Sequence, residues 1–208
     1  NGGIKRFGRR SEMDYSRYRR AGAHVWALAA LFLLIQLADF GARLLPGGSA
    51  MGVRLGLLAL ILPFGYAVVL LTLGGWQQRY RLTAVCALAA AGMGVALAHP
   101  EGFSARTATA VSIAFFFMGA LAEYLECSSH GLVFAFISPG LRRRWGQLWT
   151  WYIWTLAAEL LGELAVRLLP GAAAAIELVT GLAVFAQRMG KLVLLPVSAR
   201  ELRRRPRC

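Results

Sequence analysis

Six apolar stretches alternate along the chain with short segments rich in Arg, Pro and Gly. They lie at residues 23–45, 53–73, 82–98, 107–127, 147–169 and 172–187. Five have about 20 residues or nearly so, the length needed to cross a hydrocarbon layer of roughly 30 Å as a helix. The third has 17 residues and is rich in Ala and Gly. The pattern predicts an all-α, polytopic integral membrane protein with six transmembrane helices.

The basic residues divide the chain in the same way. Nineteen of the 23 Lys and Arg lie before the first stretch, after the last, or in the second-to-third and fourth-to-fifth loops. Because basic loops stay on the cytoplasmic face, both termini are expected there, or on its organellar equivalent. This organisation predicts a basic N-terminal segment (1–22), a transmembrane domain (23–191) and a basic C-terminal tail (192–208).

Internal repetition predicts how the six helices are paired. Residues 19–47 resemble residues 143–171 at a constant offset, with Arg-Arg-x-Gly at the start and Leu-Leu-Pro-Gly at the end. At half that offset, Arg-Tyr-Arg occurs at 17–19 and again at 79–81. The pattern favours three parallel helical hairpins, each entering from the basic side. The alternative is chance similarity, because Leu, Ala, Arg and Gly dominate the composition.

Composition excludes an ordinary soluble domain: 58% of residues are hydrophobic, 16% are charged, and mean hydropathy is +0.55. The net charge of +13 fits nucleic acid in principle. However, the basic residues adjoin apolar ends and tryptophans, as in an interfacial belt. We therefore expect anionic lipid rather than nucleic acid as the partner of the basic residues, namely Arg19, Arg20, Arg142, Arg143, Arg144, Arg203, Arg204 and Arg205.

Three apolar segments carry further expectations. Residues 131–140 are too short to cross and are predicted to be interfacial or re-entrant on the basic side. Residues 192–197 are expected to lie along the same surface. The small residues of the third stretch predict close helix packing around a central span.

Polar residues at membrane depth are the best pointers to function, because an unpaired charge there is costly. One set is a hypothetical ion or proton path: Gln36, Asp39, Arg43, Glu159, Glu163 and Arg167. Glu159 is the deepest by residue count, and it functions either as a proton or cation acceptor or as a structural hydrogen-bonding group between helices. The pairs four residues apart, Asp39 with Arg43 and Glu163 with Arg167, predict local ion pairs.

A second set joins Glu123, Glu126 and His130 at spacings of three and four, which places them on one helix face. In outline they resemble a metal-ligand or proton-relay cluster. No Glu-x-x-His motif occurs, since Glu126 and His130 are four residues apart, and only three histidines exist. The three cysteines show no metal or disulfide spacing.

No nucleotide-binding or hydrolase motif occurs, so no catalytic residue and no cofactor is predicted, although bound lipids are expected. The short loops favour a non-catalytic integral membrane subunit of a larger membrane complex, which engages partner helices and anionic lipid. The alternative is a small proton- or cation-coupled transport protein with a path lined by Glu159, Glu163 and Asp39. A membrane-embedded enzyme comes third. The expected location is a bacterial inner membrane or an organellar membrane, with other subunits or further copies of the chain as partners.

Overall fold

The computed structural model describes residues 2–46 and 49–204, with side chains from residue 16 onward except at positions 100, 167 and 170. All long elements in these residues are helices, as the sequence predicts. They are α1 (Gly2–Leu44), α2 (Ala50–Leu73), α3 (Arg79–Ala98), α4 (Ala105–Phe134), α5 (Pro139–Leu168) and α6 (Ala173–Arg204). Two single-turn helices, η1 (Pro100–Gly102) and η2 (Pro170–Ala172), precede α4 and α6.

Five of these helices are long and apolar enough to cross a membrane: α1 from Ser16 onward, α2, α3, α4 and α6. The predicted fifth span, α5, is long enough but is not among them. Its first turns contain three consecutive arginines and Gln147, and its second half contains Glu159 and Glu163. The sequence prediction of an apolar, membrane-embedded chain therefore holds for five helices.

Helix ends differ from the predicted spans where apolar residues continue beyond membrane length. The segment predicted at 131–140 is not a separate element: its first four residues continue α4, and Phe134 is fully buried. A short turn follows, and Pro139 opens α5 at a position that suits proline, because the first helical N–H needs no partner.

The predicted tail differs in the same way, since residues 192–204 continue α6. Leu195, Ala199 and Leu202 are buried there, with the spacing of a helix face. Two serines begin helices at the opposite end of the bundle. Ser49 accepts a hydrogen bond from the Gly52 amide, and Ser104 accepts one from the Thr107 amide, so each satisfies a backbone donor that lacks a helical partner.

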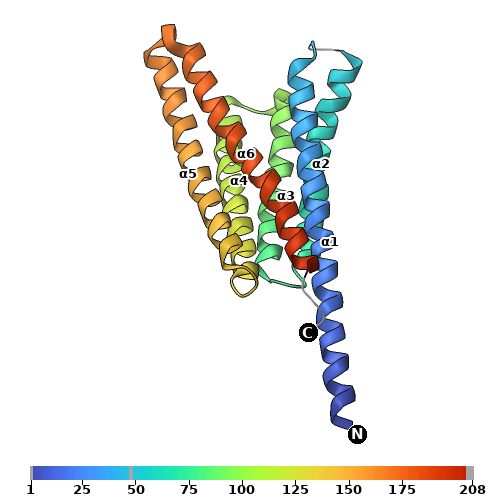
Figure 1. Ribbon diagram of the computed structural model, residues 1–208. Coiled ribbons are helices and arrows are strands. Elements are labelled where there is room, and N and C mark those ends of the chain that lie inside the picture. Colours follow the sequence, from blue (N-terminus) through green and yellow to red (C-terminus); the bar gives the residue numbers. More distant parts are fainter. Residues whose placement is uncertain (1, 47–48, 205–208) are drawn as a thin grey trace.

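The six helices pack in chain order, and α6 returns to pack against α1 (Figure 1). We call this arrangement the helix ring. Gly22 of α1 is where α6 approaches most closely: a Cβ atom there would lie 3.1 Å from the Ala199 carbonyl oxygen and 2.9 Å from Cγ of Arg203. Glycine at this position therefore lets α1 and α6 meet and complete the ring.

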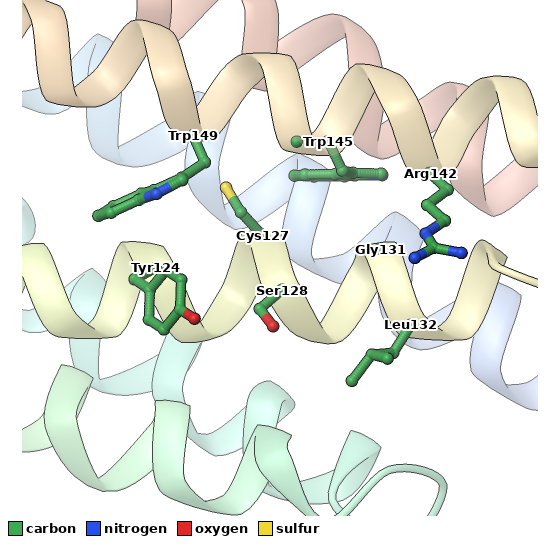
Figure 2. Close-up of a pocket in the computed structure, with 9 residues that line it drawn as sticks. Tyr124, Cys127, Ser128, Gly131, Leu132, Arg142, Trp145 and Trp149 are labelled. Carbon is green, nitrogen blue, oxygen red and sulfur yellow. The ribbon is translucent and has the colours of Figure 1, made fainter.

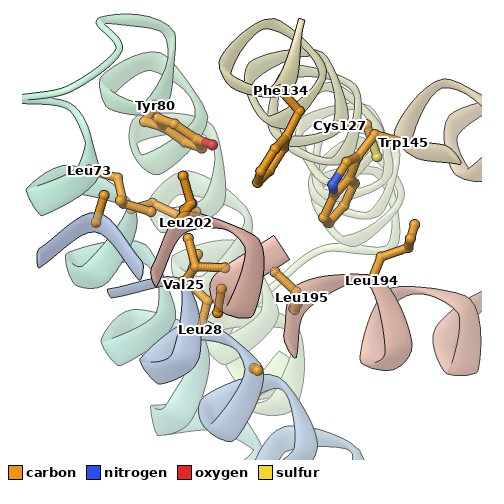
Figure 3. Close-up of a cluster of buried hydrophobic side chains, with 14 of the residues drawn as sticks. Val25, Leu28, Leu73, Tyr80, Cys127, Phe134, Trp145, Leu194, Leu195 and Leu202 are labelled. Carbon is orange, nitrogen blue, oxygen red and sulfur yellow. The ribbon is translucent and has the colours of Figure 1, made fainter. Parts of the chain in front are cut away.

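The apolar core lies in the half of the bundle where α1 starts and α6 ends. It contains Leu28, Leu70, Tyr80, Phe134, Trp145 and Leu195, one or more from each helix, and Figure 3 shows most of them converging. At the opposite end, the α5–α6 arm and the α1–α2 arm diverge (Figure 1). Large apolar side chains on both arms are exposed there, among them Leu164, Leu178 and Leu57. The bundle is thus packed at one end, here called the packed end, and splayed at the other.

Candidate functional site: a buried lysine and two carboxylates beside an apolar cavity

The most unusual feature of the interior is Lys191, whose side chain is only 3% exposed. Its Nζ lies 2.7 Å from Oε2 of Glu123 and 3.0 Å from Oε2 of Glu126. Glu123 and Glu126 are one turn apart on one face of α4, so both carboxylates reach the same ammonium. A buried charge without such partners costs several kcal/mol, about 3–5 when one member of a pair is removed. The three side chains therefore form one electrostatic unit, here called the Lys191 cluster.

Further side chains surround this cluster from α1 and α2. The Tyr66 hydroxyl donates a hydrogen bond to Oε1 of Glu126. The Lys191 ammonium lies 5.0 Å from the ring centre of Phe32 and 5.5 Å from that of Tyr66. Aromatic faces at this distance attract a cation, and the attraction is stronger away from water. Lys191 is thus held by charge on one side and by aromatic rings on the other.

His130 extends the polar groups toward the packed end. Its Nδ1 is hydrogen-bonded to the Tyr80 hydroxyl at 2.9 Å, and its ring stacks on Trp145 with centroids 4.2 Å apart. Trp145 is fixed in turn, because its Nε1 donates to the Ser198 hydroxyl at 3.0 Å. Nε2 of His130 is 3.9 Å from Oε1 of Glu126, which is too long for a hydrogen bond. Polar groups therefore run from Tyr80 through His130 and Glu126 to Lys191 and Glu123.

Two atoms of this series have no hydrogen-bond partner among the described residues: Nε2 of His130 and Oε1 of Glu123. Buried polar atoms are nearly always bonded, so each such atom requires an explanation. Glu123 and Glu126 together supply two carboxyl groups against one ammonium. With both ionised, the cluster carries one excess negative charge. The unpartnered Glu123 oxygen is where a proton or another cation would offset it.

A cavity of about 340 Å³ adjoins the cluster and contains Glu123, Glu126 and Lys191 in its wall. The rest of the lining is almost entirely apolar and comes from α1 to α4. The sequence predicted close helix packing at the small residues of the third stretch. The structure does pack α3 closely on α4, since a Cβ atom at Gly94 would lie 3.4 Å from the Phe115 ring, and it also places Ala87, Ala90, Ala91 and Gly94 along this cavity. The short side chains of α3 therefore leave space next to the charged groups.

A second, smaller pocket of about 250 Å³ lies between α4 and α5 (Figure 2). Tyr124 and Trp149 lie at one end, and Arg142 lies at the other. Cys127 points between the rings of Trp145 and Trp149. Trp145 separates this pocket from His130, because it lines the pocket and also stacks on the histidine. The pocket therefore has no direct contact with the Lys191 cluster.

The residues of the predicted ion path are divided between two places. Asp39 pairs with Arg43 at 3.1 Å, and Arg188 of α6 donates to Gln36 at 2.9 Å and to Asp39 at 3.5 Å. Glu159 and Glu163 of α5 are exposed and line a pocket of about 520 Å³ with Phe116. No described contact joins them to Asp39, although Arg188, which bonds Asp39, also interacts electrostatically with Glu159. The side chain of Arg167 lies outside the described residues.

The structure brings together the second predicted set, Glu123, Glu126 and His130, on one face of α4. The described side chains include no group of three or more His, Cys, Asp or Glu placed to hold a metal ion. Lys191 occupies the position between the carboxylates that a cation would take. The predicted lipid contacts, from Arg19 and Arg20 to Arg203 and Arg204, are exposed. Arg205 lies outside the described residues.

Sequence reasoning missed Lys191, Tyr66 and Tyr80 as members of the site. Lys191 follows the last apolar stretch and was counted with the basic ends. One signal was available: Leu194, Leu195, Ala199 and Leu202 continue an apolar helical face beyond it. Lys191 therefore lies inside a longer helix rather than at the start of a tail.

The fold and the site define a class: an all-helical chain with five helices of membrane-spanning character and a buried ion cluster inside a ring of six. Comparison with protein families, with curated proteins and with solved structures finds no match for this chain.

Proposed function

We propose that this protein is a small membrane transport protein that couples solute movement to proton binding and release at the Lys191 cluster. The observation that carries the proposal is the pairing of two buried carboxyl groups with one lysine at the wall of a cavity. Ionisable residues inside a membrane domain are costly, and they mark ion pathways and proton relays. Because the cluster has two carboxyl groups and one lysine, one carboxyl group can bind and release a proton while the other stays paired with the Lys191 ammonium.

This proposal assigns coupling to Glu123 and Glu126 instead of the path first expected along Glu159, Glu163 and Asp39. Asp39 already has two arginine partners. Glu159 is exposed on α5, whereas Glu126 is 3% exposed inside the helix ring. Exchange of a proton at an outward-facing carboxyl does not report on what occupies the interior. Exchange at Glu123 does, because the same side chain lines the cavity.

The membrane arrangement is part of the proposal. We place six crossings as three hairpins in a bacterial inner membrane or an organellar membrane, with the packed end at the cytoplasmic face. Two features support this arrangement. The exposed arginines of the α4–α5 turn and of the end of α6 lie at the packed end, where anionic headgroups would meet them. The one proposed crossing that lacks membrane-spanning character by composition is α5. It packs against α4 and α6, which would shield part of its polar surface from lipid.

Cysteine accessibility tests transport without knowledge of the solute. Ala91 lines the cavity, so Ala91→Cys in a variant without native cysteines reports which face of the membrane reaches it. Alternating access predicts that a membrane-impermeant thiol reagent labels Ala91→Cys from one face at high pH and from the other at low pH. Adding Glu123→Gln should fix labelling to one face, because a neutral amide cannot exchange a proton.

A matched control is Val85→Cys, on the exposed side of α3, the helix of Ala91, which should show no pH-dependent change of face. Labelling of Ala91→Cys from a single face at every pH, unaltered by Glu123→Gln, would contradict coupled transport. The measurement uses reconstituted protein and reagent added to either side of the vesicle.

A second candidate function is the non-catalytic subunit of a larger membrane complex, favoured by a different observation. Glu159 and Glu163 are exposed within a helix that also exposes Leu160, Leu161 and Leu164. Neither carboxylate has a hydrogen bond or ion pair among the side chains that the structure describes. A basic residue on a partner helix would satisfy them, as charges inside membranes usually find partners.

This candidate predicts a second chain at fixed stoichiometry after purification in mild detergent. The double variant Glu159→Gln, Glu163→Gln should release it, whereas Glu177→Gln, another exposed acid near the splayed end, should not. Recovery of the wild-type chain as a lone monomer or homo-oligomer would contradict the subunit function.

A further inference from the structure

We propose that the cavity binds an amphipathic organic monocation, with its ammonium group beside the Glu123 carboxylate and its apolar body along α3. This inference names the solute class and rests on the proposed function for its role in transport. The binding step itself is tested separately.

The charge of the site selects a single positive charge. Lys191 offsets one of the two carboxylates, and the remaining charge is centred on Glu123, whose second oxygen has no partner in the described structure. An ammonium beside this carboxylate restores neutrality. Because Oε1 has almost no accessible surface, the Glu123 side chain would turn toward the cavity to accept a hydrogen bond from the ligand. An anion would add a second excess charge, and a dication would reverse the sign, so both are disfavoured in a site removed from water.

The lining selects the rest of the molecule. Apart from the Lys191 cluster and Tyr66, the cavity wall consists of apolar side chains, including Phe32, Leu60 and Phe115. On α4 it extends from Glu126 to Phe115, which is eleven residues, or about 16 Å of helix. The charged groups lie at the end of this length nearest the packed end. A ligand with a charged head and an apolar body of a few carbon atoms or more matches this polarity.

The size also fits a small organic ligand. About 340 Å³ lies within the range of roughly 300–1,000 Å³ typical of pockets for such molecules. A bare metal ion would leave most of this volume, and all of its apolar wall, without contact. The cavity therefore favours an organic cation over an inorganic one.

Binding of the cation should compete with a proton for Glu123. The titratable and charged groups around Glu123 are Tyr66 on α2, Tyr152 on α5, Arg188 and Lys191 on α6, and Glu126 and Cys127 on its own helix. None of them offers Oε1 of Glu123 a hydrogen bond among the described residues. The excess negative charge can therefore be offset either by a proton or by the ligand, but not by both. Binding of the solute is thereby coupled to release of the proton.

The experiment compares octylammonium with octanol, which share a chain and differ in charge. The reconstituted full chain in nanodiscs is titrated with each ligand in weakly buffered solution at a pH below neutrality, and binding and proton release are measured together. We expect saturable binding of octylammonium with proton release, and binding of octanol weaker by about 10- to 100-fold. Empty nanodiscs correct for partition into lipid.

Two variants locate the site. Glu123→Gln should weaken octylammonium binding by about 10- to 100-fold and remove proton release, whereas Glu159→Gln should change neither. Ala90→Leu places a larger side chain in the cavity and should weaken binding while leaving the cluster intact, which keeps the test valid where Glu123→Gln does not fold.

Equal binding of octanol and octylammonium, or binding unaffected by both Glu123→Gln and Ala90→Leu, would overturn the proposal. Saturable binding at Glu123 together with labelling of Ala91→Cys from one face only would refute transport and leave the binding site standing. Alternating access without octylammonium binding would refute the solute class and leave transport standing.

Discussion

Replacing Lys191 with methionine removes the ammonium that contacts the two buried carboxylates. Methionine has a similar length and fits the aromatic surroundings, so the change removes charge more than volume. Breaking a buried ion pair by deleting one partner costs about 3–5 kcal/mol, because the other charge stays buried without compensation. We expect this loss at a pH where both carboxyls would otherwise be ionised.

The loss converts into a thermal shift. In a chain of this length, 1 kcal/mol corresponds to about 2–4 °C in the unfolding midpoint, so Lys191→Met should lower it by about 6–20 °C. Tryptophan fluorescence during heating in detergent measures the midpoint, since Trp145 lies in the core beside the cluster. The matched control is Arg43→Met: its side chain is 73% exposed, and exposed ion pairs contribute little.

A triple variant separates charge from packing. Lys191→Met combined with Glu123→Gln and Glu126→Gln removes every formal charge of the cluster, and neutral replacement of a buried ion group is often tolerated. The unfolding midpoint of this triple variant should return most of the way to that of the parent protein. A Lys191→Met protein as stable as the parent near neutral pH, or a triple variant no more stable than Lys191→Met, would refute the electrostatic reasoning.

Three further outcomes are expected. Tyr66→Phe should cost about 1.5–3 kcal/mol in the same melting assay, since it deletes a hydrogen bond to a buried carboxylate, and an unchanged midpoint would show that bond to be unimportant. Gly22→Val should lower the free energy of unfolding by about 1–3 kcal/mol by forcing α1 away from α6. Gly146→Val should lower it clearly less, because a Cβ atom there would meet no atom of another helix within 4 Å, and equal effects would contradict the close approach of α1 and α6. Cysteines at Gly102 and Gly140 should react with an impermeant reagent from opposite faces of the membrane, and reaction from the same face would overturn the proposed crossings.

The helices were predictable from the sequence, while several helix ends were not. Apolar runs of about 20 residues identify each helix, because both a membrane and a buried core require them. The end of an apolar run does not mark the end of the helix where that helix continues into the packed end. Phe134 and Leu202 are buried by neighbouring helices there, and only their long-range contacts distinguish them from residues of a loop or a tail.

The candidate site was predictable on one helix only. Spacing placed Glu123, Glu126 and His130 on one face, because helix geometry is local. Lys191 comes from a helix 65 residues later than Glu126, and no local pattern specifies that contact. Glu159 shows the converse: its depth along α5 was readable, but the direction it faces depends on how α5 packs.

The small residues of α3 were the hardest to interpret from the sequence, because they are compatible with both close helix packing and a cavity. Ala90, Ala91 and Gly94 permit close helix approach, and they equally permit a void when the neighbouring helices are held apart. Sequence fixes the size of a side chain but not the distance to the opposite helix. In this bundle Gly94 packs closely on Phe115, whereas Ala90 and Ala91 line the cavity, so neighbouring small residues of one helix give both a close contact and a binding space.

The position of the Lys191 cluster relates its charge to the shape of the bundle. α4 and α6 each pack mainly on their neighbours in the helix ring, and Lys191 of α6 bonds Glu123 and Glu126 of α4. The cluster lies between the packed end, where every helix contributes to the core, and the splayed end, where the two arms diverge. A proton or ligand cation at Glu123 weakens the attraction between that carboxylate and Lys191, because it neutralises one partner. The geometry thus places Glu123, the group proposed to sense the solute, at the ionic contact between α4 and α6.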